Sequence, residues 1–167
     1  MNKLHLLRTH LVGAVPTLAR DPDRLLTFVE EGSVEFRRGR DLSHEYRYAA
    51  QLVLTNFADE LDTVMIPLLQ WLAEYQPDVD PGEAVSFEAE ILNNRSVDLA
   101  LRVRLTERVI AKVDCEAGTI RVDRALPRFE LDACPISQHW QLLTRDTNTD
   151  DGYSLAAEWG EASNDGG

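Results

Sequence analysis

Apolar residues recur along the chain with two different spacings, and each spacing predicts a different kind of element. Residues 3–19 and 59–75 repeat apolar residues every three or four positions, which is typical of amphipathic helices. The two apolar stripes consist of Leu4, Leu7, Leu11, Val15 and Leu18, and of Leu61, Val64, Met65, Leu68, Leu72 and Tyr75. Because proline lacks an amide hydrogen, we expect Pro16 to distort the end of the first helix, and Pro67 to kink the second helix or to mark its start.

The segment between the two helices has the composition of strands. Residues 26–29 form a short apolar run that ends at a Glu-Glu-Gly sequence, and residues 33–36 are expected to form a return strand. A polar loop over residues 37–41 leads into a longer strand over residues 43–57, which is rich in Tyr, Leu and Val. This region therefore predicts two or three strands.

The clearest alternation follows the second helix. Residues 87–91 and 97–105 place apolar residues at every second position, which predicts a hairpin with one buried face. A register that keeps the apolar residues together is favoured, because a slip by one residue would mix the two faces. The expected pairs are Phe87 with Val103, Ile91 with Leu99 and, on the outer face, Glu88 with Arg102. Residues 109–113 and 119–122 are expected to form a final hairpin.

Two amphipathic helices and a mostly antiparallel sheet predict an α+β domain of two layers, with both helices packed on one face of the sheet. The periodicity fades near residue 128. Residues 129–167 contain eight acidic residues and one base. We therefore expect a domain over residues 1–128, followed by an acidic C-terminal extension over residues 129–167. This extension is expected to be partly disordered, or to become ordered against a neighbouring subunit or partner.

The overall charge argues against several classes of protein. Among 167 residues there are 17 basic and 29 acidic ones, so the formal net charge is −12, whereas nucleic-acid binding depends on clustered Lys and Arg. Apolar runs fall short of the roughly 18 residues of a membrane span, and the first residues lack a signal-peptide cleavage pattern. Cys115 and Cys134 have neither the spacing of a metal site nor that of a disulfide framework, which fits a cytosolic site of synthesis.

The histidines are poorly placed for chemistry. His5 and His10 are five residues apart and would point to different sides of a helix, unlike a metal-binding pair at i and i+4. The run Ser43-His44-Glu45 suggests a catalytic triad, but neighbouring residues of a strand point to opposite faces. We interpret these histidines as solvent-exposed or capping residues.

Two glutamates on one strand face, Glu88 and Glu90, have the residue type of an acid–base pair. An exposed face neutralised by Arg102 and Arg104 on the next strand explains the same residues better. Glycine motifs that bind phosphate are absent from the sequence. We therefore expect no enzymatic activity, no cofactor and no metal.

A basic cluster and several charged strand positions are candidates for contacts with other proteins. Arg37, Arg38 and Arg40 form a dense basic loop without the interleaved aromatic residues of a nucleic-acid site. This loop either contacts an acidic patch of a partner or is simply solvated. Trp71 lies just off the apolar stripe of its helix, which fits the rim of the core or a subunit contact equally well. The full set of candidate contacts is Arg37, Arg38, Arg40, Trp71, Glu88, Glu90, Arg102, Arg104 and Trp140.

Several short runs occur in a characteristic order. They are LARDPDRLL over residues 18–26 with EGS over 31–33, EYRY over 45–48, TNF over 55–57, PLLQWL over 67–72 with QP over 76–77, FEAEILNN over 87–94 and LTERV over 105–109. In this order the runs resemble the tail completion protein R family of contractile-tailed temperate phages and of phage-tail-like bacteriocins (R-type pyocins). The likeness covers roughly residues 1–125 and does not extend past residue 130.

This resemblance implies a structural role without catalytic residues. Such proteins are similar to tail terminators, which are small α+β subunits that form a ring, usually a hexamer, at the head-proximal end of the tail. The ring ends the polymerisation of tube and sheath, and it joins the head or closes a headless bacteriocin as a collar. The implied partners are copies of the chain, tube and sheath proteins and a head–tail connector, with assembly in the cytoplasm of the bacterial host.

The residues leave one alternative open, in which a small α+β module binds a peptide or small ligand as a monomer or dimer. The sequence does not distinguish a phage from a headless bacteriocin, and it does not define the ring number.

Overall fold

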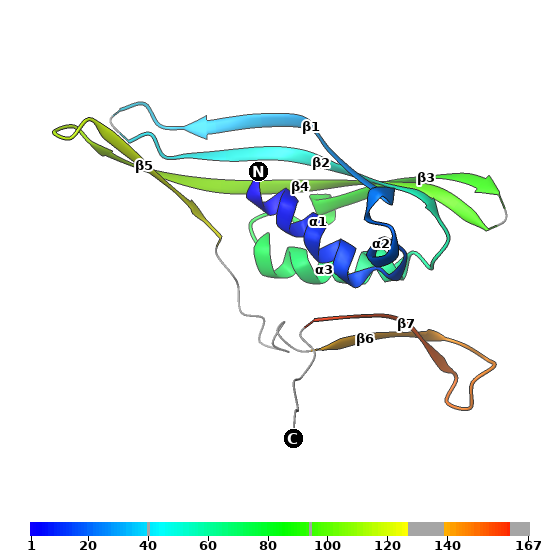
Figure 1. The fold of residues 1–167 in the computed structure, drawn as a ribbon. Helices are drawn as coiled ribbons and strands as arrows, with labels where there is room; N and C mark the ends of the chain where they lie inside the picture. Colours follow the sequence, from blue (N-terminus) through cyan, green and yellow to red (C-terminus); the bar gives the residue numbers. More distant parts are fainter. Residues whose placement is uncertain (40, 94, 127–138, 161–167) are drawn as a thin grey trace, which may run out of the picture.

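A computed structural model describes residues 1–39, 41–93, 95–126 and 139–160. These residues form a large sheet, a layer of helices on one of its faces, and a small hairpin on the outer side of the helices (Figure 1). The predicted α+β fold, with a mostly antiparallel sheet and helices on one face, is therefore confirmed.

The helices follow the predicted stripes with one interruption. They are α1 (Asn2–Ala14), α2 (Pro16–Arg20), the 3-10 turn η1 (Pro22–Arg24), α3 (Asp62–Tyr75) and α4 (Pro81–Ala84). The first predicted helix is divided at Val15, which is extended, and Pro16 occupies the first position of α2, where a missing amide hydrogen costs little. In contrast, α3 runs through Pro67, so the alternative in which this helix begins at Pro67 is wrong. None of the described helices is long and apolar enough to cross a membrane.

The main sheet is built around one long central strand. Its strands are β1 (Leu25–Phe36), β2 (His44–Phe57), β3 (Val85–Asn93), β4 (Ser96–Asp114) and β5 (Thr119–Ala125). The pairs β1–β2 and β2–β4 are antiparallel. On its other edge, β4 pairs antiparallel with β3 in its first half and with β5 in its second half.

Two pairs of predicted strands turn out to be single strands. Residues 26–29 and 33–36 both belong to β1, because a bulge between Val29 and Glu31 absorbs the polar sequence and keeps the strand paired with β2. Residues 97–105 and 109–113 both belong to the 19-residue β4, in which the charged residues between them continue the alternation.

The predicted hairpin of β3 and β4 is present, but the apolar face is buried only on β4, because Phe87 and Ile91 of β3 are 54% and 77% exposed. The register also differs from the prediction by two residues. The observed pairs include Val85 with Val103, Phe87 with Leu101, Glu88 with Ala100 and Ile91 with Val97. A shift of two leaves each side chain on its expected face, so the alternation alone cannot select the register. The short connection between the paired residues Asn93 and Ser96 selects it instead.

The core lies between α1, α3 and the part of the sheet that these helices cover. Its fully buried side chains come from both layers and include Leu7, Leu11, Val64, Leu68, Leu52, Leu54, Leu99, Leu101 and Leu105. The sheet extends beyond this core, because β5 and the ends of β1 and β4 lie past the helices (Figure 1). We call residues 32–36 of β1, residues 108–114 of β4 and all of β5 the wing.

The C-terminal extension contributes an ordered hairpin. The strands β6 (Trp140–Arg145) and β7 (Tyr153–Trp159) pair with each other and lie beside the helices (Figure 1). Ala157 is buried, and Nε1 of Trp159 donates a hydrogen bond to Oε1 of Gln70 in α3 at 2.8 Å. Residues 140–159 are thus ordered against their own protomer, while the expected boundary at residue 128 lies outside the described residues.

Candidate functional site

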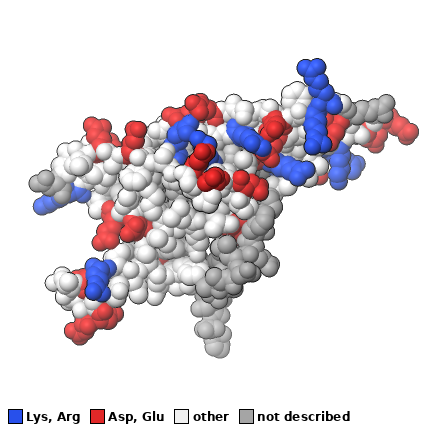
Figure 2. Space-filling view, turned by 180° about the vertical axis from the view of Figure 1, so that it is seen from behind, with Lys and Arg blue, Asp and Glu red and all other residues white. Residues whose placement is uncertain are grey.

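The face of the sheet opposite the helices carries charged side chains of both signs, which gather along the sheet in Figure 2. The main ion pairs are Arg102 with Glu30 and Glu31 at 3.5 and 2.8 Å, Arg104 with Glu83 at 2.6 Å, and Arg47 with Glu35 at 2.9 Å. Each partner is at least one-third exposed, so each pair contributes at most about 1 kcal/mol to the stability of the fold.

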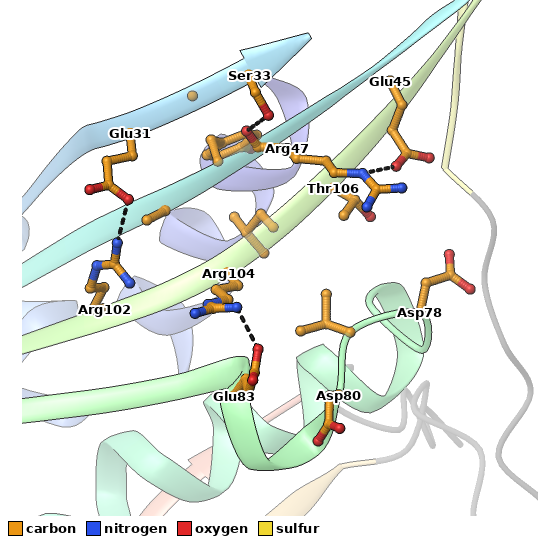
Figure 3. A pocket seen from close by; sticks show the side chains of 15 residues that line it. Glu31, Ser33, Glu45, Arg47, Asp78, Asp80, Glu83, Arg102, Arg104 and Thr106 are labelled. Carbon is orange, nitrogen blue, oxygen red and sulfur yellow. Dashed lines mark hydrogen bonds and ion pairs between the residues drawn. The ribbon is translucent and has the colours of Figure 1, made fainter. Parts of the chain in front are cut away.

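A groove of about 770 Å³ opens between this charged face and the connection from α3 to α4 (Figure 3). Glu31 and Arg102 lie along one side of the groove, and Arg104 reaches across to Glu83. Small-molecule sites are usually lined by apolar side chains with a few polar groups. Here the arginines Arg47, Arg102 and Arg104 are paired with glutamates, which suits a polar protein contact better than a small ligand.

At one end of the groove, a short part of β4 has no neighbouring strand on one edge among the described residues, and the Gln76 side chain takes the place of a strand partner there. Residues of β4 between the ends of β3 and β5 have no strand partner on this edge among the described strands. The Gln76 side chain is buried there: Oε1 accepts from the Thr106 amide at 3.1 Å and from Nζ of Lys3 at 3.2 Å, while Nε2 donates to the Thr106 hydroxyl at 2.5 Å. Burial lowers the pKa of the Lys3 amine. Gln76 thereby joins the end of α3 to the sheet and to α1.

Glu107 lies within this stretch of β4, at a position that faces the helices. Its carboxylate accepts the amides of Asn2 and Lys3, both at 3.0 Å, and the hydroxyl of Tyr48. The side chain is 6% exposed. A carboxylate at this place satisfies free amides at the start of α1 and stabilises the positive end of the helix dipole. Burial and the neighbouring carboxylate raise the pKa of the Tyr48 hydroxyl, which therefore stays a donor.

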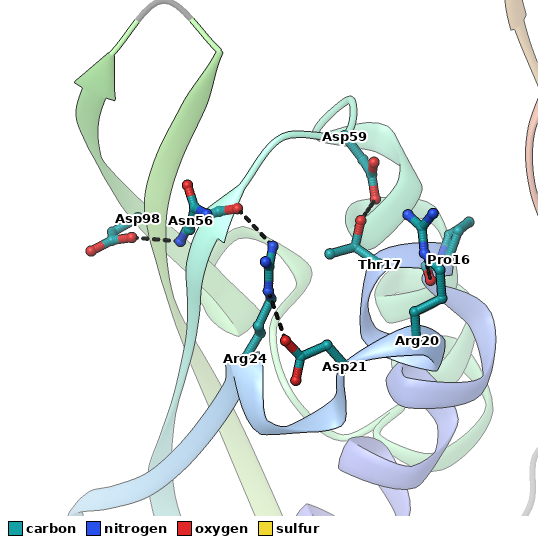
Figure 4. A network of polar contacts seen from close by, with 8 residues as sticks. All are labelled: Pro16, Thr17, Arg20, Asp21, Arg24, Asn56, Asp59 and Asp98. Carbon is teal, nitrogen blue, oxygen red and sulfur yellow. Dashed lines mark hydrogen bonds and ion pairs between the residues drawn. The ribbon is translucent and has the colours of Figure 1, made fainter.

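A second polar cluster connects η1 to the corner between β2 and β4 (Figure 4). Arg24 pairs with Asp21 at 3.1 Å and donates to the Asn56 carbonyl at 3.2 Å, while the Asn56 amide donates to Asp98 at 2.7 Å. Asn56 has a φ of 51°, a left-handed conformation that asparagine tolerates better than most residues. The runs LARDPDRLL and TNF therefore meet in space and fix chain connections.

Both outer edges of the sheet lack a further strand partner among the described residues. β1 pairs with β2, and on the opposite edge β3 and β5 both pair with β4 and have no other strand partner in the described part of the chain. In the wing, these edges expose apolar side chains on the same face: Val34 is 54%, Phe36 64%, Ile120 55% and Val122 56% exposed. Monomeric proteins usually avoid exposed apolar edge strands, so the wing has the properties of an assembly surface.

The structure separates the predicted contact residues into several groups. Arg37 and Arg38 are exposed beyond the end of β1, whereas Arg40 lies outside the described residues. Glu88 and Glu90 are exposed on β3, and Trp140 begins β6. Arg102 and Arg104 lie on the charged face, but they pair with Glu30, Glu31 and Glu83 instead of the glutamates of β3.

Trp71 lies in the core, so the structure favours the first of the two positions that the sequence allows. Its side chain is 3% exposed and packs in the core beside Tyr75, with 4.9 Å between the ring centroids. Trp71 points inward because it lies three residues after Leu68 and seven residues after Val64, which are both buried on the same face of the helix.

His10, His44 and Ser43 each form a side-chain hydrogen bond within the fold. Nε2 of His10 donates to the Pro67 carbonyl at 3.1 Å, and burial lowers the pKa of this ring. Nδ1 of His44 contacts the Leu42 carbonyl at 2.9 Å, whereas the Ser43 hydroxyl accepts the Ala111 amide at 3.0 Å. In the part of the chain that the structure describes, no group of three or more acidic, histidine or cysteine side chains is placed to hold a metal ion.

Sequence reasoning missed Gln76, Glu107 and the exposed edges of the wing. A signal for Glu107 exists, since it interrupts the apolar series of β4 at a position where Leu105 and Val109 face the helices. Gln76 has no comparable signal, because its partners are distant in sequence.

Comparisons with known proteins found a matching family model and a similar protein. The family model described as P2 phage tail completion protein R (GpR) matches residues 1–127. The tail completion protein R of Escherichia phage P2 is 38% identical over 114 residues, which are 65% of this chain and 74% of that protein. No solved structure matches the chain.

Proposed function

Because the chain belongs to the P2 phage tail completion protein R family, we propose that it is a structural, non-enzymatic subunit that completes a phage tail. Copies of the chain form a ring, a hexamer, at the head-proximal end of a contractile tail. The ring ends the polymerisation of tube and sheath proteins, which are its partners, and presents a surface to the head or closes a headless particle. It is assembled in the cytoplasm of the bacterial host.

The observation that supports ring formation is the pair of unpartnered sheet edges on opposite sides of one small domain. A ring requires two different surfaces on each subunit that fit each other head to tail. The edge of β1 and the edge of β5 are two such surfaces, and both expose apolar side chains.

Ligand binding by a small monomeric module receives less support. The charged groove beside α4 has a volume of about 770 Å³, and its arginines are paired with glutamates of the same chain.

The proposal is tested by deleting the gene from the prophage or bacteriocin cluster that encodes it and measuring tail lengths by electron microscopy. Without a terminator, we expect tubes and sheaths of irregular and excessive length, restored by the gene supplied in trans. Native mass spectrometry of purified tail ends should show the chain as a multiple of 18.8 kDa. Normal tail lengths after deletion, together with a chain that stays monomeric in all preparations, would contradict the proposal.

A further inference from the structure

We propose that β5 of one copy pairs with β1 of the next copy, so that the sheets of neighbouring subunits join into one continuous antiparallel sheet. This inference rests on the proposed ring and names the contact that closes it. The paired segments are residues 32–36 of β1 and residues 120–124 of β5.

The direction of the strands permits this contact. Along the order β1, β2, β4, β5, each strand is antiparallel to its neighbour, so β1 and β5 run in opposite directions. When a rotation places the β5 edge of one copy against the β1 edge of the next, the new pair is antiparallel as well. We call this contact between β5 of one copy and β1 of the next copy the seam. Its strands pair with the same geometry as the antiparallel pairs within each subunit.

The apolar side chains select the face. Val34 pairs with Tyr46 in β2, and Tyr46 pairs with Glu107, whose side chain contacts α1; Val34 therefore points to the helix side of the sheet. Val122 pairs with Ala111, which lies an even number of residues from Glu107 and so points to the same side. Joining the edges places exposed apolar side chains of two subunits next to each other.

The charges select the register. The β1 strand carries Glu30, Glu31 and Glu35 without a base, whereas β5 carries two arginines and one aspartate. One antiparallel register satisfies both faces: it pairs Phe36 with Ile120, Glu35 with Arg121, Val34 with Val122 and Gly32 with Arg124. Moving β5 by two residues in one direction sets Glu35 against Asp123, and moving it in the other direction sets Glu35 against Thr119.

Arg121 has a free charge for this contact. It takes part in no ion pair between described residues, and it lies on the face opposite the helices, like Glu35. Glu35 is 68% exposed even while it contacts Arg47, so a second arginine can approach it.

The test is a disulfide between subunits in assembled tails. In a chain with Cys115→Ser and Cys134→Ser, the substitutions Val34→Cys and Val122→Cys place two thiols directly opposite each other across the seam. After mild oxidation, we expect a ladder of covalent multimers beyond the dimer on a non-reducing gel. The matched control is Val34→Cys with Ile120→Cys, in which the thiols are offset by two residues. Offset positions are about 7–8 Å apart and should form little disulfide.

The outcomes separate the seam from the proposed function. Three results would contradict the seam while the chain is present in tails: no covalent multimers, dimers alone, or the same ladder from both cysteine variants. None of these results would contradict a role in tail completion. If the chain is absent from tails and its deletion leaves tail length normal, the proposed function fails, and the seam fails with it.

A second measurement relies on charge instead of cysteine chemistry. Glu35→Arg or Arg121→Glu alone should raise the concentration of half-maximal assembly about fivefold, because each places like charges across the seam. The double variant should restore assembly, and Glu116→Arg, on the exposed turn after β4, should leave it unchanged. A double variant that assembles no better than the single ones would overturn the register.

Discussion

The covered part of the sheet and the wing follow the same alternation of apolar and polar residues, but they differ in what covers the apolar side. On β4, Leu99, Leu101 and Leu105 are at most 1% exposed beneath α1 and α3. In the wing, Ile120 and Val122 point to the same side of the sheet and are more than half exposed.

This difference shows that alternation predicts the face on which a side chain lies, while tertiary structure decides whether that face is buried within the chain. The helices of this domain end before the sheet does (Figure 1). The remaining apolar surface is therefore available for contacts between chains, and substitutions in the two regions should have different effects.

The largest difference is expected between Leu101→Ala and Val122→Ala. Leu101 is fully buried, so its truncation should lower the free energy of unfolding by about 3 kcal/mol. Val122→Ala should change it by less than about 0.5 kcal/mol, because the side chain is already exposed in the protomer. Urea denaturation at low protein concentration measures both, and equal losses would remove the distinction between the two regions.

Glu107 should be the most sensitive polar residue of the covered part. Glu107→Ala leaves two amides and the Tyr48 hydroxyl without their acceptor, so the free energy of unfolding should fall by about 2–3 kcal/mol. Glu116→Ala, on an exposed turn, is the matched control and should be nearly neutral. Two variants of equal stability would show that the carboxylate does not stabilise the start of α1.

The C-terminal hairpin should contribute less than the core. We propose that a chain ending at residue 128 still folds cooperatively and loses about 1 kcal/mol, since it gives up the Trp159–Gln70 hydrogen bond and the burial of Ala157. Circular dichroism during thermal unfolding tests this, with Gln70→Leu as a control that removes the acceptor of the hydrogen bond and keeps the hairpin. A truncated chain without a cooperative transition would mean that residues 129–167 belong to the domain.

The smallest effect concerns pH. Burial holds the pKa of His10 below its ordinary value of 6.5, so the unfolded chain binds a proton before the folded one as the pH falls. This contribution to stability is complete above pH 6.5 and is lost at lower pH, by less than about 1.4 kcal/mol per pH unit. His10→Gln keeps a donor for the Pro67 carbonyl and should flatten the dependence. An unchanged slope in this variant would exclude His10 as its source.

Local patterns predicted the long helices α1 and α3, the strand faces and the fold class, but not the short helix α4. They did not predict features for which two local arrangements fit the sequence equally well, such as strand registers, or features that depend on a contact with a residue distant in sequence. The register of β3 on β4 can shift by two without changing a face, and the bulge at Glu31 looks like a turn in the sequence.

The candidate site was less predictable than the fold. Arg102 and Arg104 were recognised as charged surface residues, but their partners come from β1 and α4. Trp71 lies at the edge of the apolar stripe, so the sequence allowed either a core position or a subunit contact. In the structure its ring packs against Tyr75 and is buried.

The continuity of β4 has a mechanical consequence. At about 3.3 Å per residue, its 19 residues span about 60 Å, from the end of the β3–β4 hairpin through the core to the tip of the wing. A load applied to the wing along the strand direction acts in shear on the hydrogen bonds to β2, so many of them must break together. The wing is therefore expected to resist such a load together with the core and not to separate from it.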